Sequence, residues 1–119
     1  MPRILVVDDE PLISMLMEGW LNELGCEVVG PVGSLKDGLD LAESVEIDGA
    51  ILDVNLVGEN SLSLANALKL KGVPVALATG DSGIDEAAGF ADTILLHKPF
   101  AFEDVKAAWA SCSSLQLRP

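Results

Sequence analysis

Acidic side chains follow two apolar segments of the chain at the points where those segments end. The acidic run 8–10 comes directly after the apolar residues 4–7, and Asp53 comes directly after the apolar residues 50–52. Carboxylates that share a small cleft repel one another at neutral pH unless a cation joins them or their pKa values rise. Oxygen ligands that leave room for water suit Mg²⁺, with Mn²⁺ as the second choice. This pattern predicts a divalent-metal site, provided that the fold brings the two segments together.

A hydroxyl and an amine follow two later segments in a similar way. Thr79 comes after the apolar residues 74–78, and Lys98 lies two residues after the strand-like residues 93–96. A carboxylate beside a metal ion can act as a nucleophile, and a Lys charge with a hydroxyl donor can then hold a phosphoryl group. The combined set is typical of phosphoryl transfer onto a carboxylate.

Each of these residues also has a structural explanation that involves no chemistry. Acids at 8–10 suit the N-terminus of a helix, where they interact favourably with the helix dipole. Asp53 and Thr79 could be turn residues, and Lys98 could lie on the surface. These residues can therefore form a site only if the fold places all of them at one edge of a sheet.

Short apolar segments alternate with helical patterns along the chain. The expected strands are residues 4–7, 27–30, 50–52, 74–78 and 93–96, and the expected helices are residues 11–24, 34–45, 61–71, 80–91 and 102–111. Ser34 and Ser61 are expected to cap two of the helices. The alternation predicts an α/β fold, a doubly wound five-stranded parallel sheet of the flavodoxin-like order 2-1-3-4-5 with helices on both faces. In that order every strand except the second, which ends at Gly30 and Pro31, brings a candidate residue to the same edge.

The composition narrows the class of protein. The chain has 119 residues, and its 19 acidic and 7 basic residues give a net charge of −12. This charge argues against binding to nucleic acid or to an anionic membrane surface, because both need clustered Lys and Arg. We find no apolar segment near the ~20 residues of a membrane span, so a cytoplasmic protein is expected. The length predicts one domain at residues 1–112 and a flexible tail at residues 113–119.

Four motifs in this order resemble the receiver domains of bacterial two-component response regulators. They are ILVVDDEP at residues 4–11, AILDVNL at residues 50–56, LATG at residues 77–80 and HKPF at residues 97–100. The resemblance covers about residues 2–112 and is to the stand-alone, single-domain type. There is also a partial resemblance to a subgroup named for a Phe-Ala-Thr-Gly-Tyr motif, with Leu77 in place of the Phe and Asp81 in place of the Tyr.

The resemblance implies a role for each candidate residue. Asp53 is the expected phosphoacceptor, while Thr79 and Lys98 are expected to bind the phosphoryl oxygens and to take part in switching. The expected Mg²⁺ ligands are Asp8, Asp9, Asp53 and the backbone carbonyl of Asn55.

The implied function is that of a phosphoacceptor response regulator in a two-component phosphorelay. A sensor histidine kinase or a histidine phosphotransferase would donate the phosphoryl group, and the phosphorylated state would alter binding to a downstream protein target. A homodimer through the fourth helix, fifth strand and fifth helix is a further expectation. The protein is not expected to be an enzyme beyond its own phosphorylation and dephosphorylation. Three alternatives stay open: a relay intermediate or phosphate sink without output, an aspartyl-phosphate phosphatase, and a docking module that takes no phosphate.

Two positions that depart from the common receiver pattern are candidates for modulating the reaction. Leu95 lies three residues before Lys98, where many receivers carry an aromatic ring that moves when the Thr engages the phosphate. The signal is therefore expected to travel through ordering of residues 80–89. Asp81 lies two residues after Thr79, where a carboxylate could cap the following helix or reach the mouth of the site.

Replacement of Asp81 by Ala or Tyr should lengthen the lifetime of phosphorylated Asp53 by a few-fold to tenfold, about 1 kcal/mol. The reason is that a carboxylate near the acyl phosphate can act as a general base on the attacking water. Decay of the phosphorylated protein after removal of the donor measures this lifetime. A lifetime equal to or shorter than that of the wild type in both variants would leave Asp81 as a helix cap.

Overall fold

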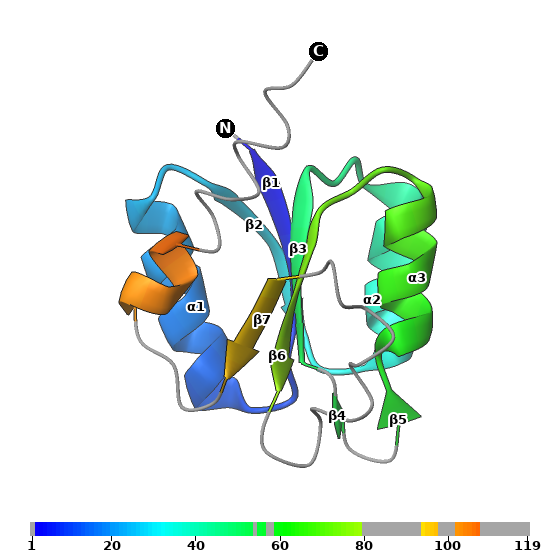
Figure 1. The fold of residues 1–119 in the computed structure, drawn as a ribbon, viewed down its shortest axis with the longest axis horizontal. Helices are drawn as coiled ribbons and strands as arrows, with labels where there is room; N and C mark the ends of the chain where they lie inside the picture. The colour runs from blue at the N-terminus through cyan, green and yellow to red at the C-terminus, as the bar shows by residue number, and fades with distance from the viewer. Residues whose placement is uncertain (1, 54, 57–58, 80–93, 98–101, 108–119) are drawn as a thin grey trace.

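The computed structural model describes residues 2–53, 55–56, 59–79, 94–97 and 102–107 (Figure 1). Its strands are β1 (Arg3–Val7), β2 (Glu27–Val32), β3 (Gly49–Asp53), β4 (Asn55–Leu56), β5 (Glu59–Asn60), β6 (Val75–Thr79) and β7 (Ile94–His97). Its labelled helices are α1 (Pro11–Glu23), α2 (Leu35–Ser44) and α3 (Leu62–Leu70), and residues 102–107 are also helical.

The main sheet is parallel and has the order β2-β1-β3-β6-β7. The order of its first four strands, with helices packed on the sheet, confirms the predicted α/β, flavodoxin-like arrangement. All strands of this sheet run toward the same end of the molecule, where the short antiparallel pair β4–β5 also lies (Figure 1). The chain therefore collects the residues that follow β1, β3 and β6 at one edge.

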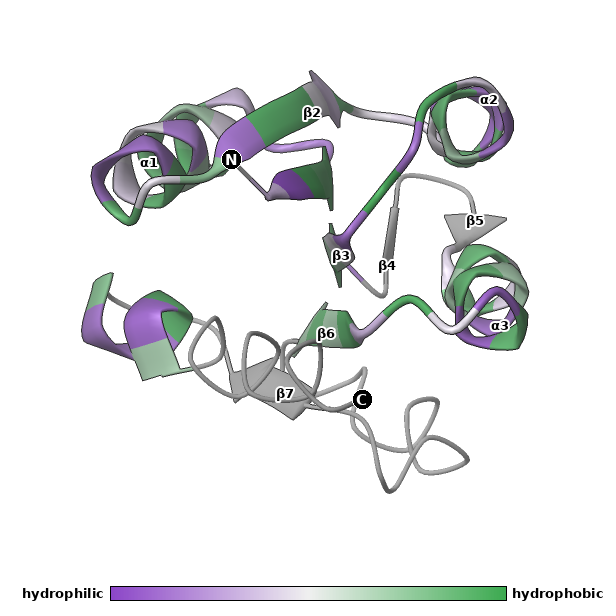
Figure 2. Cartoon of the chain, turned by 90° about the horizontal axis from the view of Figure 1, so that it is seen from above, coloured by the Kyte–Doolittle hydropathy of each residue, from purple (hydrophilic) through white to green (hydrophobic). Residues whose placement is uncertain are grey.

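The residues of the central strands alternate between two apolar cores, one on each face of the sheet. Leu5 and Val7 of β1 point to the face covered by α2 and α3, whereas Ile4 and Val6 point to the face covered by α1 and by residues 102–107 (Figure 2). The second face also holds a contact between the rings of Trp20 and Phe102, whose centroids lie 6.3 Å apart. Near-continuous apolar strands are required because both faces are buried.

The first helix begins and ends where the sequence indicates. Pro11 occupies its first turn, where a missing N–H costs no hydrogen bond, and Gly25 follows its end with φ of 84°. Ser34 caps α2 as predicted, since its hydroxyl accepts a hydrogen bond from the Asp37 N–H at 3.2 Å. Within the described ranges, we find no helix with both the length and the apolar character that crossing a membrane requires.

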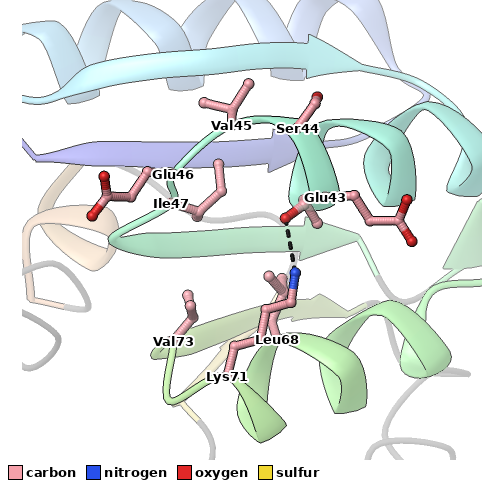
Figure 3. Close-up of a pocket in the computed structure, with 9 residues that line it drawn as sticks. Glu43, Ser44, Val45, Glu46, Ile47, Leu68, Lys71 and Val73 are labelled. Carbon is pink, nitrogen blue, oxygen red and sulfur yellow. Dashed lines mark hydrogen bonds between the residues drawn. The ribbon is translucent and has the colours of Figure 1, made fainter.

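A hydrogen bond joins α2 to the residue that follows α3 at the end of the sheet away from β4 and β5. The Lys71 Nζ donates to the backbone carbonyl of Ala42 at 3.0 Å, beside a hollow of ≈ 400 Å³ (Figure 3). Ala42 lies in the last turn of α2, where carbonyls lack partners within the helix, so Lys71 acts as a cap supplied by the neighbouring helix. This polar contact stabilises the packing of the two helices at the end of the molecule away from β4 and β5.

Two helical glycines provide a matched test of this packing. A Cβ on Gly38 would lie 2.8 Å from the Leu64 Cδ2 and 3.1 Å from the Val7 Cγ2, whereas nothing lies within 4 Å of a Cβ on Gly19. Gly19→Ala should therefore stabilise the fold by up to about 1 kcal/mol through lower backbone entropy. Gly38→Ala should destabilise it by about 1 kcal/mol, because overpacking outweighs the same gain. Urea unfolding measures both values, and equal stabilities of the two variants would contradict the close approach of α2 to the sheet.

Candidate functional site

Four carboxylates meet at the carboxyl ends of β1 and β3. Asp8, Asp9, Glu10 and Asp53 each offer an oxygen, and these oxygens all lie within 4.8 Å of one another. Asp8 and Asp53 are buried, with 6% and 4% of their surface exposed, while Asp9 is half-buried and Glu10 is exposed. The structure thus brings together the three aspartates that the strand order predicted to converge, and it adds Glu10, the end of the same acidic run.

Hydrogen bonds to the main chain hold the turn between β1 and α1 in place. The Asp8 N–H donates to the Val32 carbonyl of β2 at 2.9 Å, and the Ser14 hydroxyl of α1 donates to the Asp8 carbonyl at 3.2 Å. The Glu10 N–H donates to the Asp8 Oδ1 at 2.8 Å. Both the backbone and the carboxylate of Asp8 are therefore oriented by neighbouring elements.

The contribution of β2 to this turn was not predicted. The strand was expected to end at Gly30 and to offer nothing, but it runs on to Val32, where it accepts the bond from Asp8. Gly30 has φ of 96°, and a Cβ there would lie 2.9 Å from the Val32 N and 3.2 Å from the Val6 carbonyl oxygen. Only a residue without a side chain fits this backbone. β2 can continue through the Pro that follows, because β2 is an edge strand, where a missing N–H is tolerated.

The backbone of Asp53 is held in place by Ser61. Ser61 is fully buried, and its hydroxyl donates to the Asp53 backbone carbonyl at 2.6 Å. The prediction that the Ser61 side chain caps α3 is therefore wrong: the helix begins directly after it, but the hydroxyl makes no cap bond. The hydroxyl is instead used to fix the peptide of the residue that ends β3.

A short hairpin that the sequence analysis missed lies between these two residues. β4 and β5 pair in antiparallel fashion, with Asn55 opposite Asn60 and Leu56 opposite Glu59. Two-residue strands are too short for an alternating pattern to reveal them. Asn55, whose backbone carbonyl is a predicted metal ligand, lies in the first strand of this hairpin, two residues after Asp53 in the chain.

The donor set fits a divalent cation that prefers oxygen ligands. An octahedral ion with bonds of about 2.1 Å holds its ligand oxygens about 3 to 4 Å apart, which the clustered carboxylates satisfy with small side-chain adjustments. Mutual repulsion of the carboxylates favours a bound cation. The residues that would hold Mg²⁺ are Asp8, Asp9 and Asp53, with Glu10 at the exposed rim.

Thr79 and Leu95 lie in described strands, and the pairing of these strands gives the position of their backbone relative to the site. Asp53 pairs with Ala78 in the β3–β6 ladder, so Thr79 lies one residue further toward the same edge. Leu95 pairs with Leu77, away from that edge. The remaining predictions lie outside the described residues: Asp81, Lys98, the expected helix at residues 80–91, residues 108–111 of the last expected helix and the tail at residues 113–119.

Comparisons with known proteins agree with this geometry. The family model of the response regulator receiver domain matches residues 4–110. The solution structure of SdrG from Sphingomonas melonis Fr1 is 40% identical with a TM-score of 0.84, covering 95% of this chain and 97% of that one. The structure of the response regulator TrrA from Thermotoga maritima in complex with Mg²⁺ and BeF is 30% identical with a TM-score of 0.82, covering 94% and 99%.

The chain matches part of a longer curated relative. The transcriptional regulatory protein PdtaR of Mycobacterium tuberculosis is 30% identical over an alignment of 107 residues, and the match covers 87% of this chain and 52% of the relative. The chain thus spans about half the length of the curated relatives it matches. The similarity concerns the part of PdtaR that aligns with this chain.

Conversion of Asp9 to Asn should raise the metal-free Tm by a few degrees, because it relieves repulsion within the carboxylate cluster. The same change should weaken Mg²⁺ binding at least about tenfold and so reduce the stabilisation that Mg²⁺ provides. Thermal unfolding in EDTA and in Mg²⁺ measures both effects. The control is Asp40→Asn on the exposed face of α2, which should change neither. A lower metal-free Tm for the Asp9 variant would refute the repulsion argument.

Proposed function

The chain belongs to the response regulator receiver domain family, and from this we propose that it is a phosphoacceptor of two-component signalling in which Asp53 takes the phosphoryl group. The observation that carries the proposal is the position of Asp53. It ends a fully buried strand, and its carboxylate lies within 4.8 Å of the oxygens of Asp8, Asp9 and Glu10. A buried nucleophilic carboxylate beside a metal-binding cluster is what transfer to an aspartate requires.

The reaction consists of one displacement at phosphorus. A carboxylate oxygen of Asp53 forms a bond to the phosphorus of a phosphohistidine while the P–N bond breaks. The electron pair of that bond stays on the imidazole nitrogen, which takes up a proton, and Asp53 becomes an acyl phosphate. Asp8 and Asp9, with the Asn55 carbonyl, would hold Mg²⁺ beside the nucleophile. When bound, the ion supplies positive charge that offsets the charge on the phosphoryl oxygens.

Thr79 and Lys98 complete the proposed machinery. The position of Thr79 one residue beyond the partner of Asp53 supports a role for its hydroxyl as a donor to the phosphoryl group. For Lys98 the support is the HKPF motif, which begins at the last residue of β7. A fixed cation there would pair first with the carboxylate and then with the phosphate.

The phosphodonor and the output belong to the same proposal. A sensor histidine kinase or a histidine phosphotransferase would supply the phosphoryl group in the cytoplasm, and a downstream protein would read the phosphorylated state. The net charge of −12 argues against direct contact with nucleic acid. Homodimerisation through residues 80–91, β7 and residues 102–111 is a further part of the proposal. Chemistry beyond the chain's own phosphorylation and dephosphorylation is not part of it.

Incubation with Mg²⁺ and phosphoramidate should add one phosphoryl group to the wild type, and Asp53→Asn should abolish this addition because the amide is not a nucleophile. Intact-protein mass spectrometry measures the gain. Asp40→Asn, which removes an exposed carboxylate from α2, should still be phosphorylated. EDTA should suppress the reaction of the wild type. Equal labelling of the Asp53 variant and the wild type would overturn the assignment.

A further inference from the structure

The buried polar residues of the site form two matched pairs. Among the residues whose burial the structure describes, the buried polar or charged ones are Asp8, Ser14, Asp53 and Ser61. In each pair the serine hydroxyl donates to the backbone carbonyl of the aspartate, at 3.2 Å for Ser14 and at 2.6 Å for Ser61. A buried hydroxyl needs such a partner, and in both pairs it finds one on the main chain of a carboxylate that belongs to the cluster.

The bond from Ser61 closes the base of the β4–β5 hairpin. Asp53 lies two residues before β4, and Ser61 follows β5 directly. The bond therefore joins the two ends of the segment whose backbone pairs Asn55 with Asn60. The carbonyl that Ser61 holds belongs to the peptide through which the chain leaves β3 toward Asn55.

We propose that Ser61 is a positioning residue that orients the Asp53 peptide and, through the hairpin, the backbone carbonyl of Asn55 at the metal site. This inference rests on the proposed phosphoacceptor function for its meaning in the reaction, whereas its effect on Mg²⁺ binding can be measured without phosphorylation. Ser61 lies behind the main chain of Asp53 and acts through it. Groups that orient metal ligands in this way commonly change metal affinity by about 10- to 100-fold when removed.

The length of the bond and the burial of its donor favour this role over simple filling of the core. At 2.6 Å the bond lies at the short end of the range for a hydroxyl donor, and Ser61 is 0% exposed, so water cannot replace the hydroxyl without a rearrangement. Loss of the donor leaves a buried carbonyl to find another partner. The peptide of Asp53 then loses one of the bonds that orient it and the hairpin that follows it.

The test uses the full chain with three substitutions. Ser61→Ala deletes the donor, and Ser61→Thr keeps it. Ser44→Ala is the control, since it deletes another hydroxyl-to-carbonyl bond, the 2.8 Å bond to Asp40 at the end of α2. Titration calorimetry with Mg²⁺ alone should give a Kd about tenfold higher for Ser61→Ala. The Thr variant should stay closer to the wild type than the Ala variant, and the control should match the wild type.

Amide hydrogen exchange of the metal-free proteins provides a second readout. Ser61→Ala should speed exchange at residues 55–56 and 59–60, whereas Ser44→Ala should not. If the Ala variant does not fold, Ser61→Cys takes its place, because a thiol has a similar size and is a weaker donor. A wild-type Kd together with wild-type exchange in the variant that lacks the hydroxyl would overturn the inference.

The two proposals fail in different ways. If the wild type takes up no phosphoryl group but Ser61→Ala still weakens Mg²⁺ binding, the phosphoacceptor function is wrong and the positioning role stands. If Asp53 is phosphorylated and the Ser61 variant matches the wild type in both Mg²⁺ affinity and amide exchange, the positioning role is wrong and the phosphoacceptor function stands.

Discussion

Two carboxylates of like charge, those of Asp8 and Asp53, lie buried where neighbouring parallel strands end. The pairing of β1 with β3 holds them there, since Val7 lies opposite Leu52 and each aspartate is the next residue along its strand. Apolar packing on both faces stabilises that pairing and so overcomes the repulsion between the two charges. The remaining features of the site follow from this constraint. Because the two carboxylates repel each other, the backbone around each of them has to be held in place.

Hydrogen bonds to the main chain of the two aspartates provide that restraint. β2 accepts a hydrogen bond from the Asp8 N–H, α1 donates to the Asp8 carbonyl, and the residue before α3 donates to the Asp53 carbonyl. These bonds connect both helix layers and the edge strand to the two aspartates. The carboxylate oxygens are thereby held close to one another, while the backbone groups behind them keep their partners.

The order of the first four strands and the convergence of the three aspartates could be predicted from the sequence. Apolar segments that end in acidic residues are visible in the chain, and parallel order then decides which ends meet. The path of β2 past Gly30 could not be predicted, since Gly followed by Pro usually indicates a turn. For Ser61 the prediction was wrong because a serine before a helix has two possible partners. Its choice of the Asp53 carbonyl depends on the tertiary fold.

The separation of the two ends of the sheet has a consequence for how such a sequence can diverge. The acidic cluster lies at the carboxyl ends of the strands, and the cap that Lys71 places on α2 lies at the other end. The apolar residues between them carry the folding stability, and their side chains supply no oxygen to the cluster. Substitutions at the cluster can therefore accumulate one at a time without loss of the fold.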